Sequence, residues 1–254
     1  MYFSKKFSKF KNLNHCFFSK NGGISNDIYS TLNCGLGSND RKDNVQNNFD
    51  IVSKKIGVAR NSLFLMNQTH SNKVVTIDKY NKNILKIDAD ALVTNIKNIA
   101  ISVLTADCVP VLIYDDVNRV VACVHAGWRG AVSGIIKNTL NEIIKIGKSN
   151  KIYVAVGPCI GARNYEVGKD FYDKFLKENN KNEIFFLHNK EDKFLFDLRK
   201  YVNYKIKEFD IEHVENIDFD TYAEKEKFFS FRRSRQLGEK DYGRCISTIG
   251  LLHI

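Results

Sequence analysis

Two histidines and one cysteine stand out because each lies at one end of an apolar, strand-like run. His70 precedes the run NKVVTI, Cys108 lies between AISVLT and PVLIYD, and His125 follows RVVACV. Two imidazoles and one thiolate suit zinc, and three protein ligands leave a fourth position open, as in catalytic zinc sites. These residues are too far apart in the sequence to form a compact zinc-binding motif, so the zinc hypothesis rests on their types and positions alone.

Asp107 directly precedes Cys108, and the sequence leaves three interpretations of it equally open. Adjacent side chains of an extended segment point to opposite faces. Asp107 therefore faces away from a metal at Cys108 unless the chain turns there. Its carboxylate is a catalytic base, a group that orients a metal ligand, or a plain turn residue.

Arginines in two segments are candidate anion contacts. Arg232 and Arg233 lie beside phenylalanines in FFSFRRSR, and Arg129 lies in HAGWRG, before a helix expected from about residue 131. Guanidinium groups match phosphate oxygens, and a helix N-terminus also favours an anion. The structural alternative for FFSFRRSR is a strand with solvent-facing arginines. The single tryptophan, Trp128, is either a surface that stacks on a purine or a buried wall of its turn.

The composition is that of a globular protein with a basic surface. The formal net charge is +10, and 43% of the residues are hydrophobic. The lysines are dispersed among asparagines and form no basic arm, so nucleic acid is not expected as a partner. No apolar run approaches the roughly 18–20 residues of a membrane span, and the N-terminus has no signal-peptide core. Six dispersed cysteines without a CxxC pair favour free thiols and a cytoplasmic location.

Strand-like and helix-like segments alternate along the chain, which predicts a layered α/β or α+β fold. The chain has two prolines and no linker, so a single domain over residues 1–254 is expected. Continuous apolar runs such as Val111–Tyr114 favour strands that are covered on both faces. Strands are expected at 72–77, 91–94, 100–105, 110–115, 119–126, 151–157 and 245–252. Helices are expected at 44–56, 131–146 and 168–177, and from the candidate N-cap Asp197 onward.

Taken together, the motifs resemble those of the YfiH-like family, in the same order, from about His15 to the C-terminus. This family is also called the laccase-domain, polyphenol-oxidase-type or purine nucleoside phosphorylase family. The combination of ADCVP with HAGWRG is highly specific. The matching segments are GGIS, STLNCGLGSND, NQTHSNKVV, DADALVTN, LTADCVPVLIYD, VVACVHAGWRGAVSGII, VAVGPCIGARNYEVG, and FFSFRRSR followed by GRC.

The resemblance implies an α/β domain related in fold to the catalytic domain of cytotoxic necrotizing factor toxins. It implies a zinc site, with copper as the weaker alternative, formed by His70, Cys108 and His125. It also implies phosphorolysis of adenosine, inosine, guanosine and 5′-methylthioadenosine, so the expected partners are purine nucleosides and phosphate. Deamination of adenosine and peptidoglycan quality control are further activities associated with the family.

From the residues and the resemblance together we expect two groups of site residues. The catalytic group is His70, Cys108, His125 and Asp107. The substrate or phosphate contacts are Gln68, Arg129, Arg232 and Arg233. Two positions depart from the family pattern. Phe49 follows Asn48 where an arginine is frequent, which removes an anion contact, and Asp220 stands where a cysteine is frequent.

Three other functions are alternatives to phosphorolysis. A multicopper oxidase needs several His-x-His pairs, and the sequence has none. A Cys/His hydrolase or deamidase would use Cys108 as nucleophile and His125 as base. If the protein is instead a peptidoglycan-editing factor, its cellular phenotype should survive the loss of His70 or Cys108. The usual zinc deaminase motif is absent, so deamination would need a different arrangement. The preferred nucleoside and the oligomeric state stay open.

Overall fold

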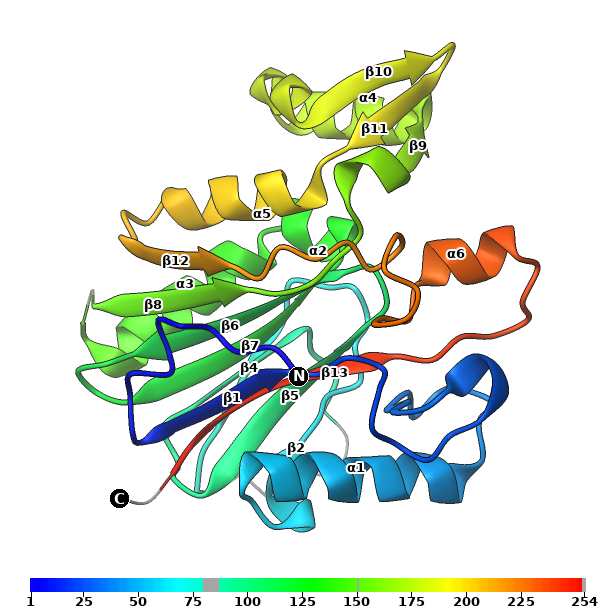
Figure 1. The fold of residues 1–254 in the computed structure, drawn as a ribbon. Helices are drawn as coiled ribbons and strands as arrows, with labels where there is room; N and C mark the ends of the chain where they lie inside the picture. The colour runs from blue at the N-terminus through cyan, green and yellow to red at the C-terminus, as the bar shows by residue number, and fades with distance from the viewer. Residues whose placement is uncertain (80–86, 150, 253–254) are drawn as a thin grey trace.

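Two stacked β-sheets form the centre of the protein. The computed structural model describes residues 1–79, 87–149 and 151–252, so the histidine at 253 lies outside the described residues. Within them, the larger sheet has six strands and the smaller one four (Figure 1). In spatial order the larger sheet contains β12 (His213–Asn216), β8 (Ile152–Val156), β6 (Val109–Asp115), β7 (Val120–Ala126), β4 (Ala91–Thr94) and β3 (Val74–Ile77). The smaller contains β1 (Leu13–Phe17), β13 (Cys245–Leu251), β5 (Ile99–Thr105) and β2 (Leu63–Phe64).

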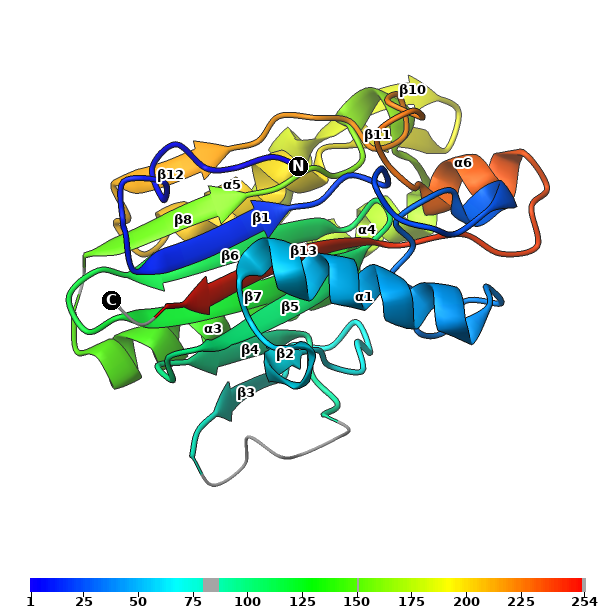
Figure 2. The ribbon, with the colours of Figure 1, turned by 60° about the horizontal axis from the view of Figure 1, so that its bottom comes forward.

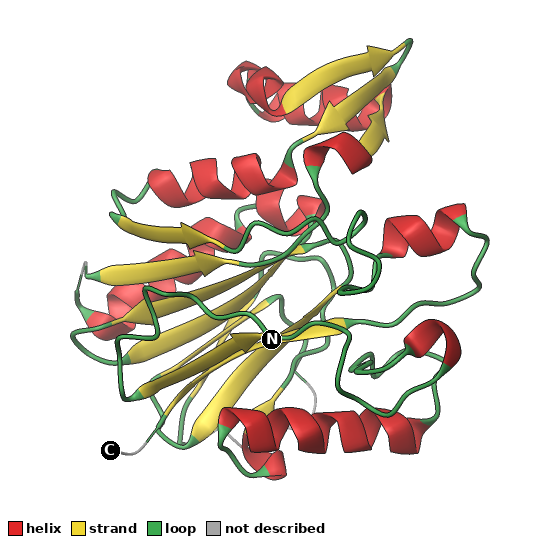
Figure 3. Ribbon diagram, viewed as in Figure 1, coloured by secondary structure: helices red, strands yellow, loops and turns green. Residues whose placement is uncertain are grey.

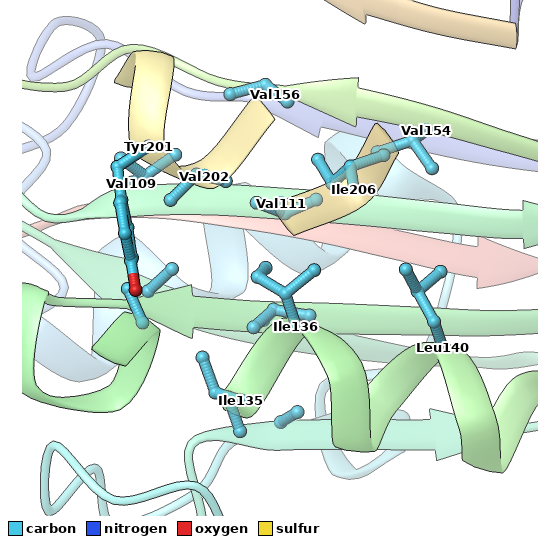
Figure 4. Packing of buried hydrophobic residues seen from close by; sticks show 14 of the residues in the cluster. Val109, Val111, Ile135, Ile136, Leu140, Val154, Val156, Tyr201, Val202 and Ile206 are labelled. Carbon is cyan, nitrogen blue, oxygen red and sulfur yellow. The ribbon is translucent and has the colours of Figure 1, made fainter. Parts of the chain in front are cut away.

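Helices cover the outer faces of both sheets. Helices α3 (Ile135–Gly147) and α5 (Leu198–Lys207) pack on the larger sheet, and their apolar residues join its outer cluster (Figure 4). Helix α1 (Lys42–Ile56) lies along the smaller sheet (Figure 2) and packs its apolar face against that sheet. The layers therefore run helix, sheet, sheet, helix, and the layered α/β class predicted from the sequence is confirmed.

Strand β6 shows why the apolar runs in the sequence are continuous. Val109, Val111 and Ile113 belong to the cluster under α3 and α5. The alternate residues Leu112 and Tyr114 belong to the cluster between the two sheets. Side chains of a strand alternate between faces, so a strand buried on both faces must be apolar at every position. The expectation that Val111–Tyr114 is covered on both faces is confirmed.

A smaller unit of three short strands and one helix forms a third sheet beyond α5 (Figures 1 and 3), and its buried residues Val167, Phe175 and Phe196 join the cluster under α3 and α5. It contains β9 (Glu166–Gly168), α4 (Lys169–Glu178), β10 (Phe186–Lys190) and β11 (Lys193–Phe196), with β11 in the middle of the sheet. The sequence analysis missed these strands because β10 is largely exposed and lacks an apolar pattern. The 3₁₀ helices are η1 (Asp27–Tyr29), η2 (Arg60–Ser62), η3 (Ala162–Asn164) and η4 (Asn180–Phe185).

All seven predicted strands are present, with ends within two residues of the expectation. One helical prediction and one strand alternative need correction. The segment expected as one helix over 131–146 is two, α2 (Trp128–Val132) and α3, because Gly134 adopts a positive φ of 96° between them. Arg129 therefore lies inside a helix rather than before one. The strand alternative for FFSFRRSR is wrong: Phe231–Gln236 is helix α6, capped by the Ser230 side chain, which accepts from the backbone of Arg233.

Other expectations from the sequence have mixed outcomes. Asp197 caps α5 as expected, since its side chain accepts from the Lys200 amide. All six cysteines lie in the described part of the chain as free thiols. No helix of the described residues has the length and apolar character needed to cross a membrane. The relation to the toxin domain stays a prediction.

His15 of β1 makes the stability of the fold depend on pH. Its ring is 3% exposed, and Nε2 accepts a hydrogen bond from the Ser4 amide. Burial lowers the pKa of His15 to about 4, despite the opposing charge of Glu215. The unfolded chain protonates this residue near pH 6.5. The stabilisation is therefore complete above pH 6.5 and is lost as the pH falls toward 4.

We expect the wild-type free energy of unfolding to fall by roughly 2 kcal/mol more between pH 7 and pH 4.5 than that of His15→Gln. Glutamine can still accept the Ser4 hydrogen bond but does not titrate. Urea denaturation at the two pH values measures the difference. Equal pH slopes for the two proteins would contradict this explanation.

Candidate metal centre

Two of the three predicted ligands meet because β6 and β7 are neighbours. The strands pair antiparallel, with Pro110 opposite His125 and Val109 opposite Ala126. Cys108 directly precedes β6, and His125 is near the end of β7. The start of one antiparallel strand lies beside the end of the next. The sheet therefore brings the thiol and the imidazole to the same edge, although they are far apart in sequence.

The third residue, His70, comes from the loop before β3. Its φ is +57°, a left-handed conformation that is unfavourable for most residues other than glycine. The Asp90 carboxylate holds this loop in place, because it accepts hydrogen bonds from the backbone amides of His70 (3.0 Å) and Ser71 (2.6 Å). The Ser71 hydroxyl and the Thr69 amide donate to it as well. One buried carboxylate thus fixes the loop that presents His70.

The three side chains form a compact donor group. One donor atom from each of His70, Cys108 and His125 lies within 4.8 Å of the others, and among the described residues no other such group of His, Cys, Asp or Glu is found. Cys108 Sγ is 3.9 Å from His70 Nε2. Tetrahedral zinc holds nitrogen at about 2.0 Å and sulfur at about 2.3 Å, so a small inward shift of the side chains would bring all three donors within reach of one ion. The predicted proximity is confirmed, and the donor set fits zinc.

Asp90 is the residue that the sequence analysis missed. Its Oδ1 lies 2.8 Å from His125 Nδ1, and the Asp90 carboxylate is fully buried. This contact leaves His125 Nε2 free to face a metal, which is the carboxylate–histidine arrangement common around zinc. Burial alone would raise the pKa of Asp90, but hydrogen bonds from His125 and Ser71 hold it well below its usual range. Asp90 lies in the family motif DADALVTN, which marks it as a candidate. Only the fold shows that its carboxylate contacts His125.

Cys108 and His125 shift each other's pKa in opposite directions. Burial alone would raise the pKa of the Cys108 thiol, but the His125 charge and hydrogen bonds from both histidines lower it to about 6. Burial alone would lower the pKa of His125, but the charges on Cys108 and Asp90 raise it to about 9. Near neutral pH the thiol is therefore a thiolate, the form that binds metals and attacks electrophiles.

Gly127 is required by a close approach. A Cβ at this position would lie 2.8 Å from His70 Cδ2 and 3.1 Å from Cys108 Sγ. Both distances are shorter than ordinary van der Waals contact. The absence of a side chain at Gly127 therefore lets the backbone pass directly beside the donor group.

Asp107 points its carboxylate toward helix α6. The chain turns at this residue, where φ is +89°. The carboxylate is buried and accepts hydrogen bonds from the Thr221 hydroxyl (2.7 Å), the Ser230 hydroxyl (2.9 Å) and the Arg232 amide (2.7 Å). Burial raises the pKa of Asp107, and these donors oppose the shift. Asp107 thus joins α6 to the segment that carries Cys108, and its catalytic role stays a prediction.

The expected substrate contacts differ in how far their polar groups are already engaged. The Arg233 guanidinium donates to the backbone carbonyls of residues 221, 222 and 228. The Gln68 side chain donates to the Leu104 carbonyl and accepts from the Leu104 amide. Arg232 donates to the Glu166 carbonyl. Arg129 is exposed and, within the described residues, makes no side-chain hydrogen bond or ion pair, so its charge is the most available to a ligand.

Neither of the two departures from the family pattern is a member of the donor group. Phe49 is fully buried in the cluster under α1. Asn48 bonds the 24–33 loop through its amide, donating to Ser25 and accepting from Ile24. Asp220 accepts hydrogen bonds from Asn164 and from the Tyr222 amide. Both positions therefore have structural roles here.

The fold and the site define a layered α/β protein with a His/Cys/His donor group at the edge of its larger sheet. The chain belongs to the family described as multi-copper polyphenol oxidoreductase laccase, whose family model matches residues 14–252. Among the described residues, the group of side chains that could hold a metal ion contains two histidines and one cysteine.

Curated relatives and solved structures agree with this assignment. A purine nucleoside phosphorylase of Rickettsia conorii is 34% identical, over 90% of this chain and 97% of the relative. The purine nucleoside phosphorylase YfiH of Escherichia coli is 31% identical, over 93% of both chains. A crystal structure of a Neisseria meningitidis protein matches with a TM-score of 0.85 and 32% identity, over 96% of both chains. These matches also support the fold along nearly the whole chain.

Proposed function

We propose that this chain is a zinc-dependent purine nucleoside phosphorylase that acts as one domain over residues 1–254. The observation that carries the proposal is the His70, Cys108 and His125 donor group, oriented by Asp90. Relatives named purine nucleoside phosphorylase, which align over at least nine-tenths of this chain, support the reaction class.

In phosphorolysis a phosphate oxygen forms a bond to C1′ of the ribose, and the bond from C1′ to the purine nitrogen breaks. The electron pair leaves on the purine, which takes up a proton, and the products are the free base and ribose 1-phosphate. A bound zinc ion would supply Lewis-acid polarisation at this site. Asp90 keeps His125 oriented as a ligand, and Arg129 offers an unpaired guanidinium to phosphate.

Inosine, adenosine, guanosine and 5′-methylthioadenosine are the proposed substrates, with deamination of adenosine as an additional activity. The decisive experiment combines metal analysis of the purified protein with the release of hypoxanthine from inosine. We expect about one zinc per chain and hypoxanthine release that requires phosphate. Release that is unaffected by phosphate would indicate hydrolysis instead. With adenosine, inosine as product would show deamination, and adenine would show phosphorolysis.

A second candidate function is a thiol hydrolase or deamidase. The observation that favours it is the arrangement Cys108, His125, Asp90, which places nucleophile, base and orienting carboxylate in sequence. This candidate predicts a protein without stoichiometric metal whose Cys108 reacts rapidly with iodoacetamide. Stoichiometric zinc that protects Cys108 from the reagent until a chelator is added would exclude it.

A further inference from the structure

Two cations from different helices meet at the indole of Trp128. Arg129 follows Trp128 in α2, and its guanidinium carbon lies 4.9 Å from the indole centre. Lys174 lies on α4, and its ammonium nitrogen is 5.3 Å from the same ring. The half-buried indole packs on Phe171 and Phe175 of α4, with ring centres 4.7 Å and 6.4 Å away. These aromatic contacts fix the ring, so each cation lies close to the same fixed indole. We call Arg129 and Lys174 the Trp128 cation pair.

The Trp128 cation pair has no acidic partner within residues 1–79, 87–149 and 151–252. The salt bridges of this protein include Lys169 with Asp173 at 3.2 Å on the same helix α4, but neither Arg129 nor Lys174 takes part in one. A contact with an indole compensates a cation only in part, so both charges can still gain from an anion. An anion within reach of both side chains would gain two charge-assisted contacts.

The Trp128 cation pair lies beside the donor group. Gly127, which borders His70 and Cys108, directly precedes Trp128 in the chain. Tyr165 provides a second link. Its ring is 6.1 Å from that of Phe171, and the Arg232 guanidinium lies 5.3 Å from it. The pKa of Tyr165 is raised, mainly by burial and also by the charge of Cys108, while Arg232 and Arg129 oppose the rise. Tyr165 is therefore near enough to Cys108, Arg129 and Arg232 for all three charges to act on its hydroxyl, and its ring packs on Phe171 of α4.

We propose that Arg129 and Lys174 form a subsite for a phosphate dianion beside the donor group. The dianion is either inorganic phosphate or the 5′-phosphate of a purine nucleotide, because both present the same oxygens. The subsite deepens the phosphorylase proposal and rests on it for its role in turnover, but binding can be measured without turnover. Lys174 lies outside the sequence motifs, and this subsite assigns it a role in binding the phosphate.

The test measures binding of inorganic phosphate and of inosine 5′-monophosphate to the full chain by calorimetry. We expect Lys174→Gln to raise the Kd of at least one of these ligands about tenfold, the loss of one contact to a charged group. Lys174→Arg should restore most of the affinity. The matched control is Lys169→Gln, which removes the same charge from the same helix at a position paired with Asp173.

The two ligands identify the source of the phosphate. A weaker affinity for inorganic phosphate would assign the subsite to the co-substrate, and an effect confined to the nucleotide would assign it to a 5′-phosphate. An unchanged Kd for both ligands in Lys174→Gln, or an equal loss in Lys169→Gln, would overturn the proposal. If the wild-type protein binds phosphate through Lys174 but does not cleave inosine with phosphate, the subsite stands and the phosphorylase proposal fails.

Discussion

Replacing Cys108 with alanine is expected to abolish zinc binding and to lower phosphate-dependent cleavage of inosine by more than a hundredfold. The substitution removes one of three donor atoms, and the thiolate is the only anionic ligand of the group. Removing a residue that merely supports a ligand already costs 10–100-fold in metal affinity or activity, so losing a ligand should cost more. Metal content and hypoxanthine release, measured on the same preparation, give the two readouts.

Cys123→Ala provides the matched control for Cys108→Ala. Cys123 lies in β7, two residues before His125, and is fully buried in the cluster between the sheets. Burial raises the pKa of its thiol, so it is neutral and does not bind metal. The control should keep its zinc and its activity. A Cys108→Ala protein with full activity would remove the metal role of this residue, and zinc retained without activity would point to Cys108 as a nucleophile.

Asp90→Ala is expected to have the second largest effect, because it changes both the site and the fold. The alanine leaves the amides of His70 and Ser71 and the His125 ring nitrogen without their shared acceptor. Breaking a buried, hydrogen-bonded charge pair typically costs about 3–5 kcal/mol. We expect a loss of that size in the free energy of unfolding, and a zinc affinity lower by about 10–100-fold.

Urea denaturation and zinc competition with a chromogenic chelator measure the two effects separately. Asp88→Asn is the control, since Asp88 is exposed and bonds only the Asn67 side chain among the described contacts of its carboxylate. Asp88→Asn should change neither the free energy of unfolding nor the free energy of zinc binding by more than about 0.5 kcal/mol. If Asp90→Ala keeps wild-type zinc affinity, the orienting role of Asp90 is wrong, whatever happens to stability.

The helices and strands that could be predicted from the sequence are those whose pattern is contained in a short segment. Strands such as β6 and β7 are buried on both faces, so their apolar runs are visible in the sequence. The split at Gly134 and helix α6 were missed because positive φ values and side-chain caps depend on surroundings that a short pattern does not contain. The β10 and β11 strands were missed because β10 is largely exposed and has no apolar pattern, and the unit is held by aromatic contacts between segments distant in sequence.

The three donor residues could be predicted from the sequence, but the carboxylate that orients them could not. Cys108 and His125 are distinctive because they interrupt apolar runs, which made them visible before the fold was known. Asp90 is one of several acids near a strand, and only the pairing of β4 with β7 brings it to His125. Arg233 and Gln68 were expected to contact substrate, yet their polar atoms bond the backbone. A sequence records side-chain chemistry, whereas the partner of each polar atom is set by tertiary contacts.

The close approach at Gly127 has a consequence for how this protein tolerates sequence change. In saturation mutagenesis under selection for metal-dependent activity, position 127 should return glycine alone, because even a methyl group would push two ligands apart. Gly37, whose added Cβ would meet nothing within 4 Å, should accept many residues under the same selection. The two glycines differ because only Gly127 borders the side chains of the donor group. A mutational profile would therefore locate this site even if the reaction were not known.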